Sequence, residues 1–156
     1  MSDKNVIRPS IGVGVLVWRD KQLLLGKRLA DKQEICWQFP GGHLENNESV
    51  IDCAVREVRE ETSLKVKSLR HLGFTNNTFV IGQRPYITLL VSCDYKSGVA
   101  QTLEPDKCEQ WQWFDYQKLP TPLFKPIPLF MSQCDDLFAQ HCASHVLTDD
   151  PANARK

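Results

Sequence analysis

An amphipathic helix in the middle of the chain restricts the possible folds more than any other feature of the sequence. Ser49 and Asp52 fit a capping box at its start. Apolar residues then recur at helical spacing: Ile51, Ala54, Val55 and Val58. Three glutamates project beside this stripe, because successive helical residues lie about 100° apart: Glu57, Glu60 and Glu61. The helix therefore buries one face and presents carboxylates on the neighbouring face.

Strand patterns precede this helix. Residues 11–18 are nearly all apolar and rich in β-branched side chains, as in a strand that is buried on both faces. After a break at 19–21, residues 22–28 resume the pattern and predict a hairpin. Residues 36–39 predict a short strand that ends in a tight turn at 40–42, where one proline and two glycines let the backbone approach a ligand.

Further strand patterns follow the helix. They cover residues 66–74, 75–80, 86–95 with a turn at 96–98, and 111–115. Residues 123–142 contain Pro126 and Pro128 and predict a loop that leads into a closing helix, and residues 148–156 predict a polar tail. This order predicts an α/β (α+β) fold, a mixed β-sheet covered by helices. We expect one domain over residues 1–156, with its core at about 9–145.

The composition is that of an ordinary globular protein. Apolar residues make up 42%, and 19 basic residues balance 19 acidic ones, so nothing favours general attraction to nucleic acid or a membrane. No stretch is apolar enough to span a bilayer, and residues 1–9 lack the apolar run of a signal peptide. Six cysteines without metal-ligand spacing predict free thiols and a cytoplasmic location: Cys36, Cys53, Cys93, Cys108, Cys134 and Cys142.

The three glutamates repel one another on the helix. Like charges three or four positions apart destabilise a helix by roughly 0.2–0.5 kcal/mol per pair. A hard divalent cation would turn this repulsion into attraction, because Mg²⁺ prefers oxygen ligands and often binds one or two carboxylates together with substrate phosphates. The alternative is a solvated helix face on which Arg56 and Arg59 pair with nearby glutamates.

The wider segment resembles the Nudix box, G-x5-E-x7-R-E-U-x-E-E-x-G-U, in which U is a bulky aliphatic residue. The matching residues are Gly42, Glu48, Arg56, Glu57, Val58, Glu60, Glu61 and Leu64. Ser63 stands where glycine is usual, a change that should affect the C-terminal cap of the helix more than the carboxylates. Residues 11–119 resemble Nudix domains, whose mixed β-sheet lies between helices. LLLGKR, PGGHLE and EPDKCE-x-W-x-W look most like MutT-like nucleotide diphosphatases, nearest to the human thiopurine-nucleotide diphosphatase branch.

The resemblance implies Mg²⁺-dependent hydrolysis, with Mn²⁺ as a substitute, of the diphosphate linkage of nucleoside triphosphates to nucleoside monophosphate and diphosphate. It implies that Glu57, Glu60 and Glu61 bind the metal and that one of them, or a neighbouring acid, is the general base. Arg56 would orient Glu48 and the cluster. Glu109 is a further candidate metal ligand or base, with Glu104 as its rival in the same loop.

Further residues are candidates for substrate binding. Gly41 and Gly42 would bring backbone groups to the metal and the phosphates, and His43 follows them directly. Lys27 and Arg28 end a strand and could bind phosphate, although basic residues at a strand end are often only solvated. Phe124, with Leu123 and Ile127, could flank the base. The tryptophans read as core: Trp18, Trp37, Trp111 and Trp113.

Two alternatives remain open. The first keeps the chemistry but changes the substrate to a nucleotide-sugar, ADP-ribose or a dinucleoside polyphosphate. The second is a non-catalytic Nudix-fold ligand sensor, which would typically have lost box carboxylates that this chain keeps. The expected partner is a small-molecule nucleotide substrate, with no nucleic acid and no membrane. The expected oligomeric state is a monomer or a homodimer.

Overall fold

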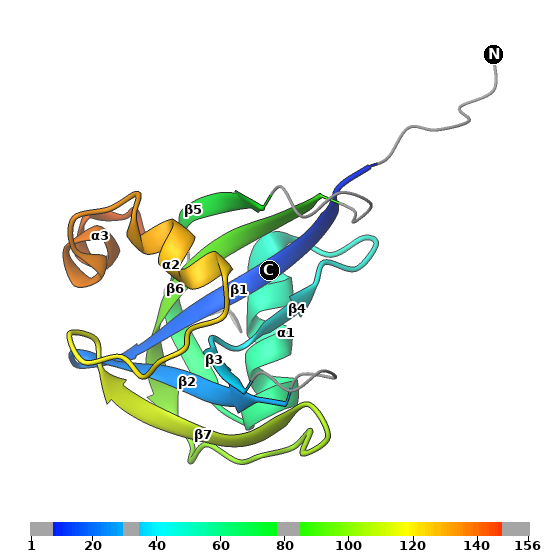
Figure 1. Cartoon of the computed structure of the whole chain (residues 1–156), viewed down its shortest axis with the longest axis vertical. Coiled ribbons are helices and arrows are strands. Elements are labelled where there is room, and N and C mark those ends of the chain that lie inside the picture. Colours follow the sequence, from blue (N-terminus) through cyan, green and yellow to red (C-terminus); the bar gives the residue numbers. More distant parts are fainter. Residues whose placement is uncertain (1–7, 30–34, 78–84, 148–156) are drawn as a thin grey trace.

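A computed structural model describes residues 8–29, 35–77 and 85–147 (Figure 1). The start of the N-terminal segment, the end of the strand predicted at 75–80 and the polar tail lie outside the described residues. Within the described part, no helix is long and apolar enough to cross a membrane. Among the described residues no cysteine forms a disulfide, as predicted.

Seven strands form one mixed sheet, which confirms the predicted fold class. They are β1 (Ser10–Arg19), β2 (Gln22–Arg28), β3 (Cys36–Gln38), β4 (Gly41–His43), β5 (Lys65–Asn77), β6 (Tyr86–Ser97) and β7 (Cys108–Asp115). The order is β3-β2-β1-β6-β5, with β4 paired to β1 and β7 paired to β2. β1 and β6 run parallel, and the other pairs are antiparallel.

The predicted hairpin of β1 and β2 opens as it leaves its turn. The two strands pair only beside the turn, Trp18 with Leu23 and Arg19 with Gln22. Farther along, β1 pairs with β4, whereas β2 pairs with β3 and β7. The sheet therefore divides between β1 and β2, and the divided end faces α1.

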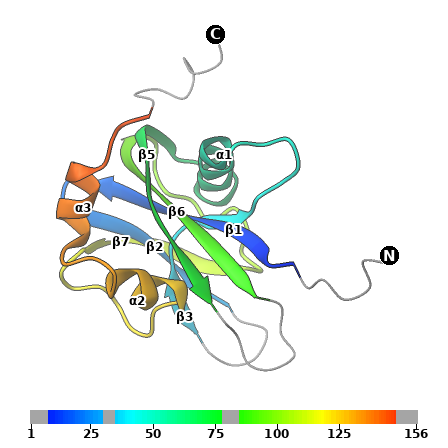
Figure 2. The ribbon, with the colours of Figure 1, turned by 90° about the horizontal axis from the view of Figure 1, so that it is seen from above.

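Helices cover both faces of the sheet (Figure 2). α1 (Val50–Thr62) packs on one face, where the valines of β1 contact Cys53, Ala54 and Val58. α2 (Pro126–Met131) and α3 (Leu137–Ala143) lie on the other face, where Leu16 and Trp18 of β1 meet Ile127 and Phe130. Alternate residues of β1 thus supply two separate cores, as expected for a central strand.

The ends of α1 follow from its sequence. The Ser49 hydroxyl caps the first turn by accepting a hydrogen bond from the Asp52 backbone N–H at 3.0 Å. Ser63 ends the helix in the left-handed region, at φ 69°, and its N–H donates to the Arg59 carbonyl. This is the position where a glycine is usual, so serine keeps the cap geometry in a conformation that is unfavourable for a side chain.

Two local predictions were wrong. Gly41 and Gly42 lie in strand β4, not in a tight turn, because their backbone pairs with Gly14 and Val13 of β1. Pro126 and Pro128 lie in helix α2, not in a loop, since proline fits the first turn of a helix, where the N–H has no helical partner.

The predicted turn at 96–98 also shifts. Lys96 and Ser97 extend β6, and the left-handed residue is Gly98, at φ 103°.

Candidate active site

A cleft of about 850 Å³ lies beside α1 and β4 and continues over β1 and β6 toward α2. Five glutamates line the cleft: Glu45, Glu57, Glu60, Glu61 and Glu104. One end of the cleft reaches Phe124 and Ile127 at the start of α2. The structure therefore brings the three helical glutamates into one cleft.

The β4 strand places glycine backbone directly against two of these glutamates. The Gly41 N–H donates to Glu61 Oε1 at 3.0 Å. A β-carbon on Gly42 would overlap the Glu57 carboxylate, and one on Gly41 would overlap the Val13 carbonyl. Gly41 therefore needs glycine, because the Val13 backbone cannot move aside, whereas a side chain at position 42 would displace the Glu57 carboxylate. The glycine backbone thus approaches the glutamates from a paired strand, and its approach to a metal or a phosphate stays a prediction.

Glu61 is buried, with only 6% of its surface exposed. The pKa of its carboxyl is raised from 4.5 to about 8, chiefly by burial and also by the negative charges of Glu57 and Glu104, against the lowering effect of the Gly41 N–H. Without a cation, this end of the cleft holds more negative charge than it can stabilise. The prediction of a carboxylate cluster on one helix face did not include the burial of Glu61, because α1 and β4 enclose it only once the strands have paired.

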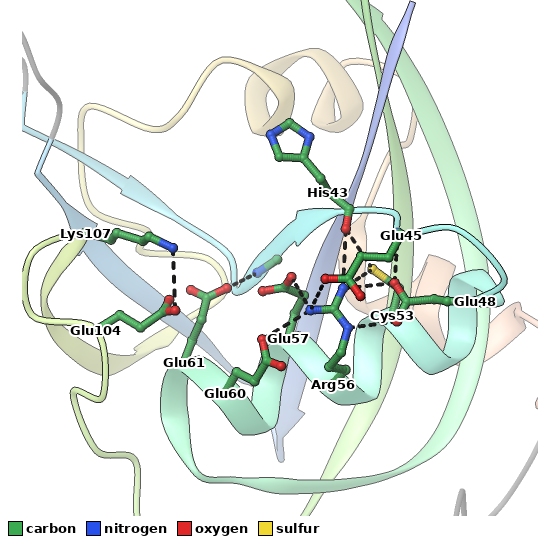
Figure 3. Close-up of polar contacts among 11 residues, drawn as sticks. His43, Glu45, Glu48, Cys53, Arg56, Glu57, Glu60, Glu61, Glu104 and Lys107 are labelled. Atoms are coloured by element: carbon green, nitrogen blue, oxygen red, sulfur yellow. Dashed lines mark hydrogen bonds and ion pairs between the residues drawn. The ribbon is translucent and has the colours of Figure 1, made fainter.

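Arg56 connects the carboxylates of the box (Figure 3). Its guanidinium donates to both oxygens of Glu48, from Nε at 2.7 Å and from Nη2 at 2.9 Å. Nη1 donates to Glu57 at 2.9 Å and to Glu60 at 3.1 Å, and Nη2 reaches the His43 carbonyl at 3.3 Å. The hydrogen bonds from Arg56 lower the pKa of Glu48 from 4.5 to about 2. Arg56 thus fixes the spacing between the start of α1 and its acidic face.

The two candidate acids near the start of β7 lie in different surroundings: Glu104 is in the loop before the strand, and Glu109 is its second residue. Glu104 lines the cleft, and its Oε1 pairs with Lys107 Nζ at 3.5 Å. Glu109 is not among the lining residues, and its side chain is 52% exposed. Its carboxylate pairs with Lys27 Nζ at 3.3 Å, so these two candidates contact each other.

The remaining candidates lie toward the open end of the cleft. Arg28 donates to Gln38 at 3.2 Å and stacks over the Phe124 ring at 4.5 Å, and both Arg28 and Phe124 line the cleft. Of the residues beside Phe124, Ile127 lines the cleft, whereas Leu123 packs on the core. His43 is exposed, lines the cleft, and turns its ring away from the glutamates (Figure 3).

The lining residues on the sheet that sequence reasoning missed include Asn77, Tyr86 and Thr88. Tyr86 packs edge-to-face on His43, with ring centroids 5.9 Å apart. The period of two in β6 groups Tyr86 with Thr88 on one face. It does not tell which face meets a cleft, because both faces of this strand are covered. Of the tryptophans, Trp18 is buried, and the other three are partly buried against the cores.

Comparison with known proteins agrees with this arrangement. Residues 8–134 match the NUDIX domain family. The RNA pyrophosphohydrolase of Hydrogenovibrio crunogenus is 31% identical over 134 residues, which cover 74% of this chain and 78% of the relative. The ADP-ribose pyrophosphatase of Methanocaldococcus jannaschii is 31% identical over 120 residues, covering 76% and 69%.

A solved structure extends the likeness to three dimensions. The MutT NUDIX hydrolase from Burkholderia pseudomallei superposes with a TM-score of 0.74 at 27% identity, and the match covers 81% of this chain and 98% of that one. All the residues that line the cleft, Arg56 among them, lie within residues 8–134, which match the family. The chain belongs to the NUDIX family of hydrolases.

Proposed function

We propose that this enzyme hydrolyses the diphosphate linkage of nucleoside triphosphates and releases a nucleoside monophosphate and diphosphate. The observation that supports it is the convergence of Glu57, Glu60 and Glu61 on a cleft large enough for a nucleotide, next to the glycine backbone of β4. A polyanionic substrate needs its charge neutralised at the point of cleavage. A cleft lined by five glutamates would meet that need with the help of bound cations.

Glu57, Glu60 and Glu61 would hold Mg²⁺, or Mn²⁺ in its place, with Gly42 beside them. No ready-made group of three metal ligands is found among the described residues. The donor set nevertheless fits a hard cation, because it consists of carboxylate oxygens and includes the buried Glu61, whose pKa is raised chiefly by burial and also by the charges of Glu57 and Glu104. The bound cation would neutralise the diphosphate and lower the pKa of an attacking water.

The other residues of the site would position these groups. Arg56 holds Glu57 and Glu60 at fixed distances and is itself held by Glu48. The Gly41 N–H holds Glu61. One of the helical glutamates, or Glu104 across the cleft, would take the proton of the attacking water. Arg28, which stacks on Phe124, would meet the substrate away from the glutamates, whereas Lys27 pairs with Glu109.

Relatives suggest other substrates for the same chemistry. Several are named RNA pyrophosphohydrolases, one is an ADP-ribose pyrophosphatase, and a Pseudomonas putida relative is named an NAD-capped RNA hydrolase. A 5′-phosphorylated RNA end, ADP-ribose and nucleotide-sugars are therefore the competing candidates. We keep the mononucleotide as first choice because the net charge of zero offers no general attraction for a long polyanion.

A substrate panel in ¹⁸O-labelled water tests the proposal. The purified chain is given nucleoside triphosphates, ADP-ribose, a nucleotide-sugar and a 5′-triphosphorylated oligonucleotide, with Mg²⁺, with Mn²⁺ or with excess chelator. We expect a nucleoside monophosphate and diphosphate from triphosphates, and no reaction in chelator. Release of a nucleoside diphosphate with orthophosphate would refute the proposed bond. If the triphosphates stay intact while one of the other compounds in the panel is hydrolysed, that compound represents the true substrate class.

We further propose that the enzyme works in the cytoplasm, where six free thiols are stable. Gel filtration with light scattering would decide between monomer and homodimer.

A further inference from the structure

Two buried polar side chains on the floor of the cleft lack a hydrogen-bond partner in the described part of the chain. Thr88 lies in β6 and is 7% exposed, and Asn77 ends β5 and is 6% exposed. Thr88 Oγ1 and Asn77 Oδ1 are closed off from solvent and unbonded, and both residues line the cleft. Buried polar groups are almost always hydrogen-bonded, because an unpaired group has lost its water and gained nothing. These two atoms therefore point to a ligand that completes their bonds.

The sheet register fixes where this floor lies relative to the glutamates. Gly12 of β1 pairs with His43 of β4 on one side and with Thr88 on the other. Adjacent strands are about 4.8 Å apart, so Thr88 lies about 10 Å from β4. The glycines of β4 contact Glu57 and Glu61. A phosphate at the glutamates and a group at Thr88 are thus separated by about the length of a nucleoside.

The walls around the floor suit a flat apolar group. Gly12 and Gly14 contribute no side chains to the cleft. Leu90 and Ile127 are apolar, and the Phe124 ring is held under the Arg28 guanidinium. A nucleobase has apolar faces and a polar edge, which match these walls and this floor. A sugar carries hydroxyls around its ring and would leave several of them against apolar walls.

We infer that Thr88 and Asn77 form the hydrogen-bonding floor of a nucleobase subsite. Asn77 Oδ1 accepts from an N–H on the base edge, and the Thr88 hydroxyl donates to or accepts from the same edge. This inference rests on the proposed function, since it assigns the base end of the nucleotide whose phosphates lie at the glutamates. It also makes Thr88 a determinant of specificity.

The matched pair Thr88→Val and Thr75→Val tests the inference. Thr75 lies directly opposite Thr88 on β5, is 1% exposed, and has an equally unbonded Oγ1, but it is not among the lining residues. Each valine replaces an unpaired buried hydroxyl with a methyl group of similar shape, so neither should lower the Tm. Binding of AMP, GMP, CMP and UMP is measured by calorimetry, with ribose 5-phosphate as the baseless probe.

For Thr88→Val we expect the tightest of the four nucleotides to bind about tenfold more weakly, the loss of one hydrogen bond. Ribose 5-phosphate should bind it as it binds the parent, and Thr75→Val should bind both probes normally. Asn77→Leu should repeat the Thr88→Val result. Unchanged nucleotide affinity in Thr88→Val, or an equal loss for ribose 5-phosphate, would overturn the inference. So would a parent that binds nucleotides no better than ribose 5-phosphate.

These binding measurements need no turnover. A parent that shows the expected pattern of affinities but hydrolyses no diphosphate would leave the subsite standing and remove the proposed function. If the parent hydrolyses triphosphates but Thr88→Val binds them as tightly as the parent does, the proposed function stands and the nucleobase subsite is overturned.

Discussion

Glu104 lies four residues before Cys108 and Glu109 lies one residue after it. The two acids nevertheless have different surroundings. The sequence pattern favours Glu109 as the extra acid of the site. In the structure Glu104 lines the cleft and raises the pKa of Glu61, whereas Glu109 pairs with Lys27. We therefore expect Glu104→Gln to lower kcat by about tenfold or more and Glu109→Gln to lower it far less. Steady-state kinetics at saturating Mg²⁺ measures both, and a larger loss in Glu109→Gln would restore the pattern-based prediction.

A variant of Glu60 can distinguish a role in metal binding from a role in an ion pair that supports the fold. Its side chain is 48% exposed, and its partner Arg56 keeps Glu48 and Glu57 when Glu60 is neutralised. Exposed ion pairs contribute about 0–1 kcal/mol, and removing a like charge relieves repulsion on α1. Glu60→Gln should therefore melt within about 2 °C of the parent in chelator, while kcat with Mg²⁺ falls about tenfold or more.

Asp52→Asn is the control for Glu60→Gln, since it neutralises an exposed acid of the same helix at its other end. It should keep kcat. A melting temperature for Glu60→Gln that is about 5 °C below the parent in chelator would mean that Glu60 mainly supports the fold.

At the scale of elements, the cap of α1 offers a stability test. Ser63 holds φ 69°, a conformation that costs a residue with a side chain roughly 1–2 kcal/mol. Ser63→Gly removes this cost but adds flexibility to the unfolded chain, so the net gain should be about 0.5–1 kcal/mol and the Tm should rise by about 1–4 °C. Ser144→Gly, at the cap of α3 with φ −77°, should bring no gain. A lower Tm for Ser63→Gly in thermal melts would contradict this account.

Local pattern was enough to predict α1, the β1–β2 hairpin and most of the long strands, because each is defined by its own periodicity. It was not enough for β4, whose three residues become a strand only by pairing with β1. The same limit applies to the site. The box glutamates share one helix face, which is local information. The burial of Glu61 and the floor at Thr88 arise from strands that are distant in sequence, and no local spacing encodes them.

Across the whole molecule, a buried polar network joins the closing helix to the sheet. His141 of α3 is 3% exposed, with Nδ1 2.6 Å from the Ser92 hydroxyl and Nε2 3.0 Å from Asp94 Oδ1. Trp18 donates to Ser92 and stacks on the His141 ring. This network lies on the same face as the start of α2, so it helps to hold the cleft wall in place.

The network predicts a stability that depends on pH. The hydrogen bond from His141 lowers the pKa of Asp94 below 3.8, and Arg70 and Lys67 on β5 lower it further. Because the folded pKa lies below the unfolded one, the contribution is present above pH 3.8 and is lost as the pH falls through the folded value. Asp94→Asn should therefore melt below the parent at pH 7, and the gap should close toward pH 3.

The exposed Asp135→Asn is the control for Asp94→Asn and should melt with the parent at every pH. A gap between Asp94→Asn and the parent that stays constant from pH 7 to pH 3 would show that the Asp94 charge is not the source of the effect.

The alternation of glycine and valine in β1 determines what a register shift of this strand would do to the protein. Gly12 and Gly14 line the cleft side, while Val13, Val15 and Val17 fill the core under α1. A slip of one residue would exchange the two sets, because side chains alternate between the faces of a strand. Valines would then block the nucleotide, and glycines would leave holes under the helix. A molecule with β1 in the shifted register would therefore be both inactive and less stable. Quality control that removes unstable chains would then also remove the chains that cannot catalyse.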